Sequence, residues 1–202
     1  RRTGWWAISK VYKSSGGQIL GDGQMVSRSV FLSWIGLGLG STLFGTMVFG
    51  FRNKYKYQVK KMQLSFANLP KAFDGLKLVQ ISDVHSGSLQ DISAVNKGID
   101  LILQQNADII FFTGDLVNDR ATEMEPLKTA FARLKAPLGV YSTLGNHDYG
   151  DYVQWPNTEA KQANLEALIN LQKEMGWDIL MNEHRIIEKE GEKIAVLGIE
   201  NW

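Results

Sequence analysis

Three short motifs in the second half of the chain combine metal-ligating side chains with groups that can move a proton. They are Asp83-Val84-His85, Gly114-Asp115 and Gly145-Asn146-His147-Asp148. Asp83 and His85 lie two residues apart, on one side of an extended chain, and together can hold one divalent cation with oxygen and nitrogen ligands. Asp115 has two carboxylate oxygens, which can bridge that cation to a second one. Asn146 offers the second cation a neutral carbonyl oxygen, so the site keeps positive charge for a phosphate.

The chemistry that such a site supports is hydrolysis at phosphorus. Two divalent cations about 3.5–4 Å apart activate a water and stabilise the oxygens of an in-line displacement. His147 follows Asn146 and is a candidate to protonate the leaving oxygen, and we expect Asp148 to orient its ring. Aspartates are also common at helix caps and turns, so each one alone has a structural explanation. All three motifs together favour the metal site.

Each motif follows an apolar run of the kind that forms a buried strand. The runs cover residues 76–82, 107–115 and 140–145, and an alternating segment over 57–66 predicts a strand before them. Helical spacing of apolar residues predicts helices over 92–103, 127–134 and 157–175, and a hairpin is expected over 185–189 and 193–199. Alternating strands and helices predict an α/β fold with helices on both faces of a sheet. Ligands of such sheets gather at the carboxyl ends of the strands, where the motifs lie.

The composition excludes several classes of protein and divides the chain in two. With 202 residues, 44% of them hydrophobic, and no cysteine, the chain is neither disordered nor disulfide-rich, and cysteine-based metal sites are excluded. Residues 1–61 hold ten Lys/Arg and one acid, a balance of +9, whereas residues 62–202 hold twelve Lys/Arg and twenty acids, a balance of −8. The basic part is therefore expected beside a membrane or a nucleic acid.

The stretch over residues 30–51 is 22 residues long and carries no charge. As a helix it would measure about 33 Å, enough to cross a membrane, although a buried helix or hairpin of a soluble protein is the alternative. Basic residues follow the span more closely than they precede it, and the positive-inside rule then places the acidic part in the cytoplasm. Residues 27–32 resemble a twin-arginine export signal that lacks one arginine, which would place the acidic part outside.

The three motifs together resemble those of the calcineurin-like metallophosphoesterases. The surrounding segments VQISDVHSG and FFTGDLVN are similar to those of the bacterial, membrane-associated branch of that family. The resemblance covers about residues 74–202. It implies a β-sandwich flanked by helices in place of an open sheet, and two divalent ions (manganese, iron or zinc) that hydrolyse phosphate esters. By matching position it places Asp83 and His85 on the first metal, Asp115 between the two and Asn146 on the second. His147 becomes the general acid or a phosphate-binding residue.

The later histidine motifs of that family do not occur before residue 202, so we expect a catalytic domain truncated at its C-terminus. We expect this stretch alone to bind metal poorly and to hydrolyse little. His184 does not match the missing motifs and is interpreted as an ordinary strand histidine. Because residue 1 is Arg, the chain is expected to be a piece of a longer one.

The predicted organisation is a basic, aromatic juxtamembrane segment over 1–29, a transmembrane helix over 30–51, a basic linker and first strand over 52–73, and the metallophosphoesterase domain over 74–202. The resulting hypothesis is a phosphohydrolase in the inner membrane of a bacterium, in contact with membrane lipids. Its expected substrate is a phosphorylated small molecule or a lipid-linked pyrophosphate such as UDP-diacylglucosamine. The alternative is a non-catalytic scaffold of the same fold, and a nuclease is disfavoured because the acidic part repels a polyanion.

Overall fold

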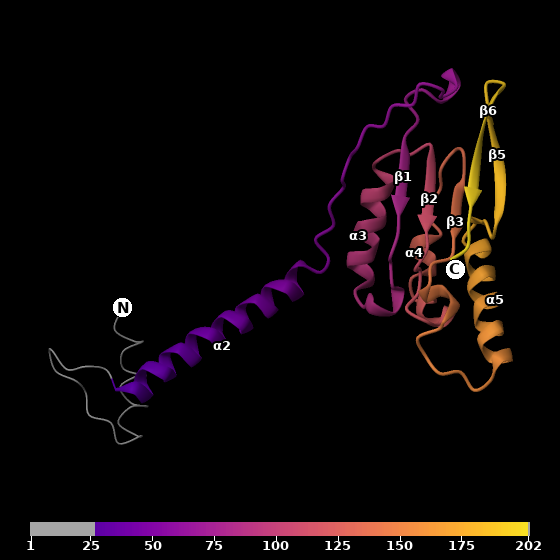
Figure 1. Ribbon diagram of the computed structural model, residues 1–202. Helices are drawn as coiled ribbons and strands as arrows, with labels where there is room; N and C mark the ends of the chain where they lie inside the picture. The colour runs from indigo at the N-terminus through magenta and orange to yellow at the C-terminus, as the bar shows by residue number, and fades with distance from the viewer. Residues whose placement is uncertain (1–26, 202) are drawn as a thin grey trace. The chain divides into compact units, whose positions relative to one another are not determined.

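The computed structural model describes residues 27–201, and it divides the chain into two units, residues 1–56 and residues 57–202. Figure 1 shows the elements of each. The expected juxtamembrane segment over 1–29 lies almost wholly outside the described residues.

In the described part of the first unit lies a long helix, α2 (Arg28–Asn53), which begins where the Ser27 hydroxyl accepts a hydrogen bond from the Val30 N–H at 3.4 Å. Within it, residues Arg28–Gly50 are long and apolar enough to cross a membrane. Its large apolar side chains point outward, with Leu43 70% and Phe44 69% exposed. A helix with apolar side chains all round needs an apolar surrounding, which a bilayer provides. By length and composition the helix is suited to the predicted span, which stays a prediction.

The second unit is built on a four-stranded parallel sheet in the order β1-β2-β3-β4. The strands are β1 (Leu78–Ile81), β2 (Ile109–Thr113), β3 (Val140–Thr143) and β4 (Asp178–Ile179). In the register, Ile81 lies opposite Phe112 and Thr113 opposite Thr143. The arrows of β1, β2 and β3 point the same way in Figure 1, so the three loops that follow them leave the sheet at one edge.

Helices cover one face of this sheet. They are α3 (Ile92–Leu103), α4 (Lys128–Phe131) and α5 (Thr158–Glu174). Short 3₁₀ turns lie in the connections, at Lys71–Phe73 before β1 and at Ser86–Ser88, Ala121–Met124 and His147–Tyr149 after β1, β2 and β3. Asp91 and Asn157 cap α3 and α5 by accepting from the N–H of Ala94 and Ala160. The core between helices and sheet includes Phe112, whose ring centroid lies 5.2 Å from that of Trp177.

The other face of the sheet is covered by an antiparallel hairpin, β5 (Glu183–Lys189) and β6 (Glu192–Gly198). Ile187 of the hairpin is buried in a second cluster with Ile109 and Phe73. The two sheets therefore pack face to face, which confirms the β-sandwich flanked by helices. The expectation of helices on both faces was wrong, because local periodicity does not decide on which side of a sheet a connection passes.

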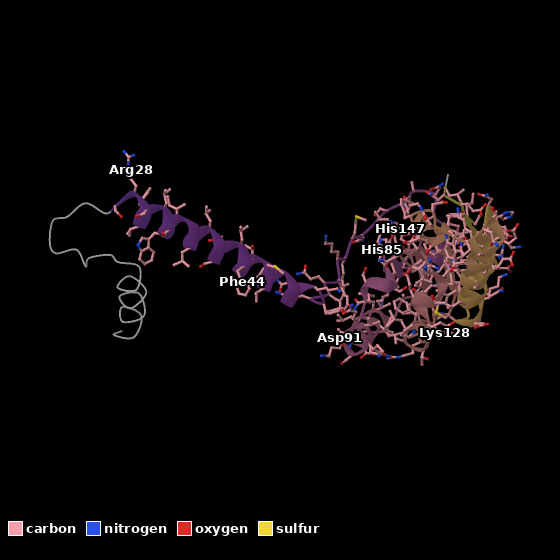
Figure 2. The ribbon with its side chains drawn as sticks, turned by 90° about the horizontal axis from the view of Figure 1, so that it is seen from below. Arg28, Phe44, His85, Asp91, Lys128 and His147 are labelled. Atoms are coloured by element: carbon pink, nitrogen blue, oxygen red, sulfur yellow. The ribbon has the colours of Figure 1, made fainter. Side chains whose placement is uncertain are left out.

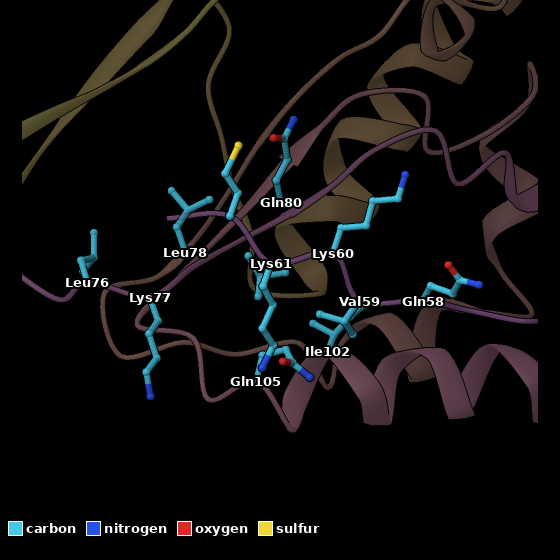
Figure 3. Close-up of a pocket in the computed structure, with 12 residues that line it drawn as sticks. Gln58, Val59, Lys60, Lys61, Leu76, Lys77, Leu78, Gln80, Ile102 and Gln105 are labelled. Carbon is cyan, nitrogen blue, oxygen red and sulfur yellow. The ribbon is translucent and has the colours of Figure 1, made fainter. Parts of the chain in front are cut away.

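The segment over 57–66 does not form the strand that its alternation predicted. In the part of the chain that is described, neither sheet includes it, and Met62 (81%), Leu64 (62%) and Phe66 (60%) are exposed. An alternating pattern becomes a strand only with a partner for its backbone groups. Residues 58–62 instead border a groove of about 620 Å³ along β1, lined by Lys60, Lys61 and Lys77 together with apolar side chains such as those of Leu78 and Ile102 (Figure 3). None of the residues predicted for the metal site lines this groove.

Candidate metal centre

The loops after β1, β2 and β3 stay hydrogen-bonded to one another beyond the ends of the strands. The N–H of Asp83 donates to the Gly114 carbonyl oxygen at 3.1 Å, and the N–H of His85 donates to the Asp115 carbonyl oxygen at 3.0 Å. The third loop joins them through the N–H of His147, which donates to Oδ1 of Asp115 at 3.0 Å. The three motifs are therefore assembled at one edge of the sheet.

His85, Asp115 and His147 form a cluster in which one potential ligand atom of each lies within 4.8 Å of those of the other two. Nε2 of His85 is 3.8 Å from Oδ2 of Asp115, and the centroids of the two imidazole rings are 4.7 Å apart in an edge-on arrangement. Figure 2 shows the two histidines side by side in the second unit. Two imidazole nitrogens and a carboxylate oxygen are a donor set that suits zinc, manganese or iron, so the residues fit a divalent cation.

Three residues of this edge have left-handed backbone conformations, with φ of 53° at Asp83, 46° at His85 and 57° at Asp115. For side chains other than glycine this conformation costs of the order of 1 kcal/mol each, and it is concentrated at functional sites. The sharp turns aim consecutive side chains in directions that a strand or helix does not allow. These turns set the directions in which the His85 and Asp115 side chains leave the backbone, and the two side chains meet.

Two glycines let the loops after β2 and β3 approach backbone to backbone. A Cβ on Gly114, where φ is 98°, would lie 2.4 Å from the Gly145 nitrogen. A Cβ on Gly145 would lie 2.2 Å from Oδ1 of Asp115. Any larger residue at either position would push Asp115 away from the other loop, which explains why a glycine precedes both Asp115 and Asn146.

Asp148 has no exposed surface, and its carboxylate holds both loops together. Oδ1 accepts from the N–H of Leu116 at 2.8 Å and of Val117 at 3.2 Å. Oδ2 accepts from the N–H of Asp115 and of Gly145, both at 2.9 Å. Burial raises the pKa of this carboxyl to about 6, and the four N–H groups oppose the rise by stabilising its charge.

Asp148 therefore orients the Asp115 loop and not, as the sequence led us to expect, the His147 ring. Nδ1 of His147 lies 2.8 Å from the carbonyl oxygen of Asn118 instead. The sequence reasoning missed Asn118, because the group that acts is a backbone carbonyl and leaves no side-chain signal.

The remaining predicted residues lie beside the cluster. Asp83 accepts a hydrogen bond from the Ser82 hydroxyl and is not among the three clustered side chains. Asn146 donates through Nδ2 to the Tyr152 hydroxyl at 2.7 Å. The Tyr152 ring stacks on the His147 ring with a centroid separation of 4.4 Å, so Tyr152 covers one face of that imidazole. His184 lies on β5, opposite Leu197, and is not part of the cluster.

A family model described as calcineurin-like phosphoesterase matches residues 76–198, which include every motif residue. Among curated proteins, a transmembrane protein with metallophosphoesterase domain from Danio rerio is 26% identical over 147 residues, covering 71% of this chain and 31% of the relative. The UDP-2,3-diacylglucosamine pyrophosphatase LpxG of Chlamydia trachomatis is 43% identical over 90 residues, 43% of this chain and 27% of the relative. The chain thus spans less than a third of the length of either relative.

A solved structure, the phosphopantetheinyl hydrolase PptH of Mycobacterium tuberculosis, is also similar. It shares 20% identity at a TM-score of 0.41, covering 60% of this chain and 41% of that one.

Proposed function

Because the chain belongs to the calcineurin-like phosphoesterase family, we propose that the protein is a membrane-anchored phosphohydrolase that uses two divalent metal ions to cleave a phosphate ester or a pyrophosphate. The observation that carries the proposal is the meeting of His85, Asp115 and His147 within 4.8 Å at the carboxyl edge of the sheet. Nothing in folding requires two histidines and a buried aspartate to converge there.

The proposed ligands divide between two positions. Asp83 and His85 would hold one ion and Asn146 the other, with Asp115 between them. The backbone of Asp115 is fixed from both sides, because its carbonyl oxygen accepts from His85 and its N–H donates to Asp148. For Asp83 to join His85 its side chain must turn away from the Ser82 hydroxyl, and for Asn146 its amide must leave Tyr152. Both are rotations of partly exposed or exposed side chains at little cost.

When bound, divalent cations would lower the pKa of a water and withdraw charge from the phosphoryl group. His147 is the proposed general acid for the leaving oxygen. Its ring is fixed by the Asn118 carbonyl on one nitrogen and by the stacked Tyr152 ring on one face, so its other nitrogen keeps one direction. To donate, the ring must be the imidazolium, with a proton on each nitrogen. Nδ1 then keeps its hydrogen bond to the Asn118 carbonyl while Nε2 gives its proton to the leaving oxygen, and the neutral ring that remains is protonated on Nδ1.

The proposed substrate is lipid-linked, because α2 would keep the catalytic unit at the bilayer surface. The similarity to LpxG makes UDP-diacylglucosamine the first compound to test. We propose the inner membrane of a bacterium as the location, with the catalytic unit on the cytoplasmic side. Five basic residues between Arg52 and Lys61 support this orientation through the positive-inside rule.

The test uses the full-length protein in detergent, stripped of metal by chelation, with manganese titrated back. Turnover of an aryl phosphodiester, an aryl phosphomonoester and UDP-diacylglucosamine is measured for the wild type and for Asp115→Asn. The matched control is Asp151→Asn, because Asp151 is an exposed partner of Lys161 outside the cluster.

We expect manganese-dependent turnover that falls by at least about a hundredfold in Asp115→Asn and is unchanged in Asp151→Asn. A folded wild type that turns over none of the three substrates with manganese, iron or zinc would contradict the proposal and leave a non-catalytic scaffold. Cleavage of the aryl esters without the nucleotide lipid would reject the lipid substrate and retain the hydrolase.

A further inference from the structure

The His147 ring is held by a backbone oxygen whose own position needs support. Nδ1 of His147 lies 2.8 Å from the carbonyl oxygen of Asn118. A carbonyl oxygen only accepts hydrogen bonds, so Nδ1 carries the proton of the neutral ring. Nε2 is then the nitrogen left to bind an ion or exchange a proton. The choice between the two tautomers therefore depends on where the loop after β2 places one carbonyl group.

One carboxylate fixes that loop. Glu123, in the 3₁₀ turn Ala121–Met124, accepts from three successive backbone N–H groups. Oε2 accepts from Asn118 at 2.7 Å, and Oε1 accepts from Arg120 at 3.0 Å and from Asp119 at 3.3 Å. Charged acceptors give stronger hydrogen bonds than neutral ones, so this half-buried group anchors the N–H side of residues 118–120, while the Asn164 amide donates to the Asp119 carbonyl oxygen at 3.0 Å.

The loop after β1 closes over the same carboxylate. A Cβ on Gly87 would lie 2.5 Å from Oε2 of Glu123 and 3.2 Å from Oδ1 of Asn118, so the approach depends on glycine. The side-chain amide of Asn118 donates to the Ser88 hydroxyl at 3.0 Å. Glu123 thus lies where the loops that carry His85 and Asn118 meet, without being part of the cluster itself.

We propose that Glu123 is a positioning residue for His147. It holds the Asn118 carbonyl against Nδ1 and so selects the neutral tautomer protonated there, whose Nε2 can take up the proton that the imidazolium then gives to the leaving oxygen. The importance of this for turnover rests on the function proposed above, whereas the selection of the tautomer does not. Glu123 does not touch the substrate, so its loss lowers kcat and leaves KM nearly unchanged.

The first test reads the tautomer without turnover. The full-length protein is labelled with ¹⁵N-histidine, kept metal-free at pH 8 and examined by NMR, with the His147 signals assigned by their loss in His147→Asn. The wild type should carry its proton on Nδ1. Glu123→Ala should move the proton largely to Nε2, and Glu123→Gln, which keeps one acceptor oxygen, should give a mixture. Glu125→Gln is the control, because it removes an exposed carboxylate from the same segment.

The second test compares kcat and KM in the manganese-loaded protein. We expect kcat to fall about tenfold in Glu123→Gln and about a hundredfold in Glu123→Ala, with KM within about twofold of the wild type. A folded Glu123→Gln with the wild-type tautomer and kcat would overturn the proposal, even if Glu123→Ala failed to fold. A wild type with the Nδ1 proton but no turnover would contradict the phosphohydrolase and leave the positioning of His147 intact.

Discussion

Replacing Asp148 with asparagine tests whether one buried carboxylate holds the two ligand-bearing loops together. An asparagine keeps the size of the side chain and one acceptor oxygen. Two of the four backbone N–H groups keep their acceptor, and the other two face an NH2 group that cannot accept. Asp148 has no exposed surface, so water does not reach the orphaned donors without opening the loops.

The magnitude follows from the two lost bonds. A hydrogen bond to a charged group contributes roughly 1.5–3 kcal/mol, and asparagine also removes the cost of a buried charge, which acts in the opposite direction. The net expectation is a decrease of about 2–4 kcal/mol in the free energy of unfolding. For a domain of this size that lowers the melting temperature by about 5–15 °C.

The assay is thermal unfolding of the metal-free full-length protein at pH 8, above the raised pKa of about 6, followed by near-UV circular dichroism. Asp151→Asn, which removes an exposed ion pair with Lys161, should change the melting temperature by less than about 2 °C. If the melting temperature of Asp148→Asn lay within the same 2 °C of the wild type, the hydrogen bonds of Asp148 would not be what holds the two loops together. That result would refute the reasoning.

Two further substitutions probe the approach of the loops. Gly145→Ala should abolish turnover, because the new Cβ would lie 2.2 Å from Oδ1 of Asp115 and would displace that side chain. The control is Gly40→Ala, which should leave turnover unchanged because no atom lies within 4 Å of the added Cβ. Equal rates in the two variants would contradict this prediction. Tyr152→Phe keeps the stacked ring but removes the hydroxyl that accepts from Asn146 at 2.7 Å. Because the freed amide can then turn toward an ion, manganese should bind at least as tightly as in the wild type, and a clear loss of affinity in a titration would show that the hydroxyl has another role.

The positions of the motifs at strand ends could be predicted from the sequence because both signals are local. Apolar runs mark β1, β2 and β3, and the residues that end each run are polar. The register of a parallel sheet then brings the three ends together. The cap of α3 at Asp91 is equally local, because its side chain accepts from the N–H of Ala94, three residues along the chain.

The parts that sequence reasoning missed depend on partners far along the chain. The role of Asp148 is set by N–H groups more than thirty residues away, including that of Leu116. The Asn118 carbonyl has no side-chain signature at all. Residues 57–66 carry the alternation of a strand, but a pattern of side chains does not state whether a neighbouring strand will be there. The prediction that a second sheet packs on the first, in place of an open sheet, came only from the family resemblance.

The central claim is that the edge formed by Asp83, His85, Asp115 and Asn146 holds metal ions that serve hydrolysis. Its most direct test is anomalous diffraction from crystals of the full-length protein grown with manganese. The account predicts two anomalous peaks about 3.5–4 Å apart, one on either side of the Asp115 carboxylate. A well-ordered site without any peak at Asp115, from protein that binds manganese elsewhere, would contradict it.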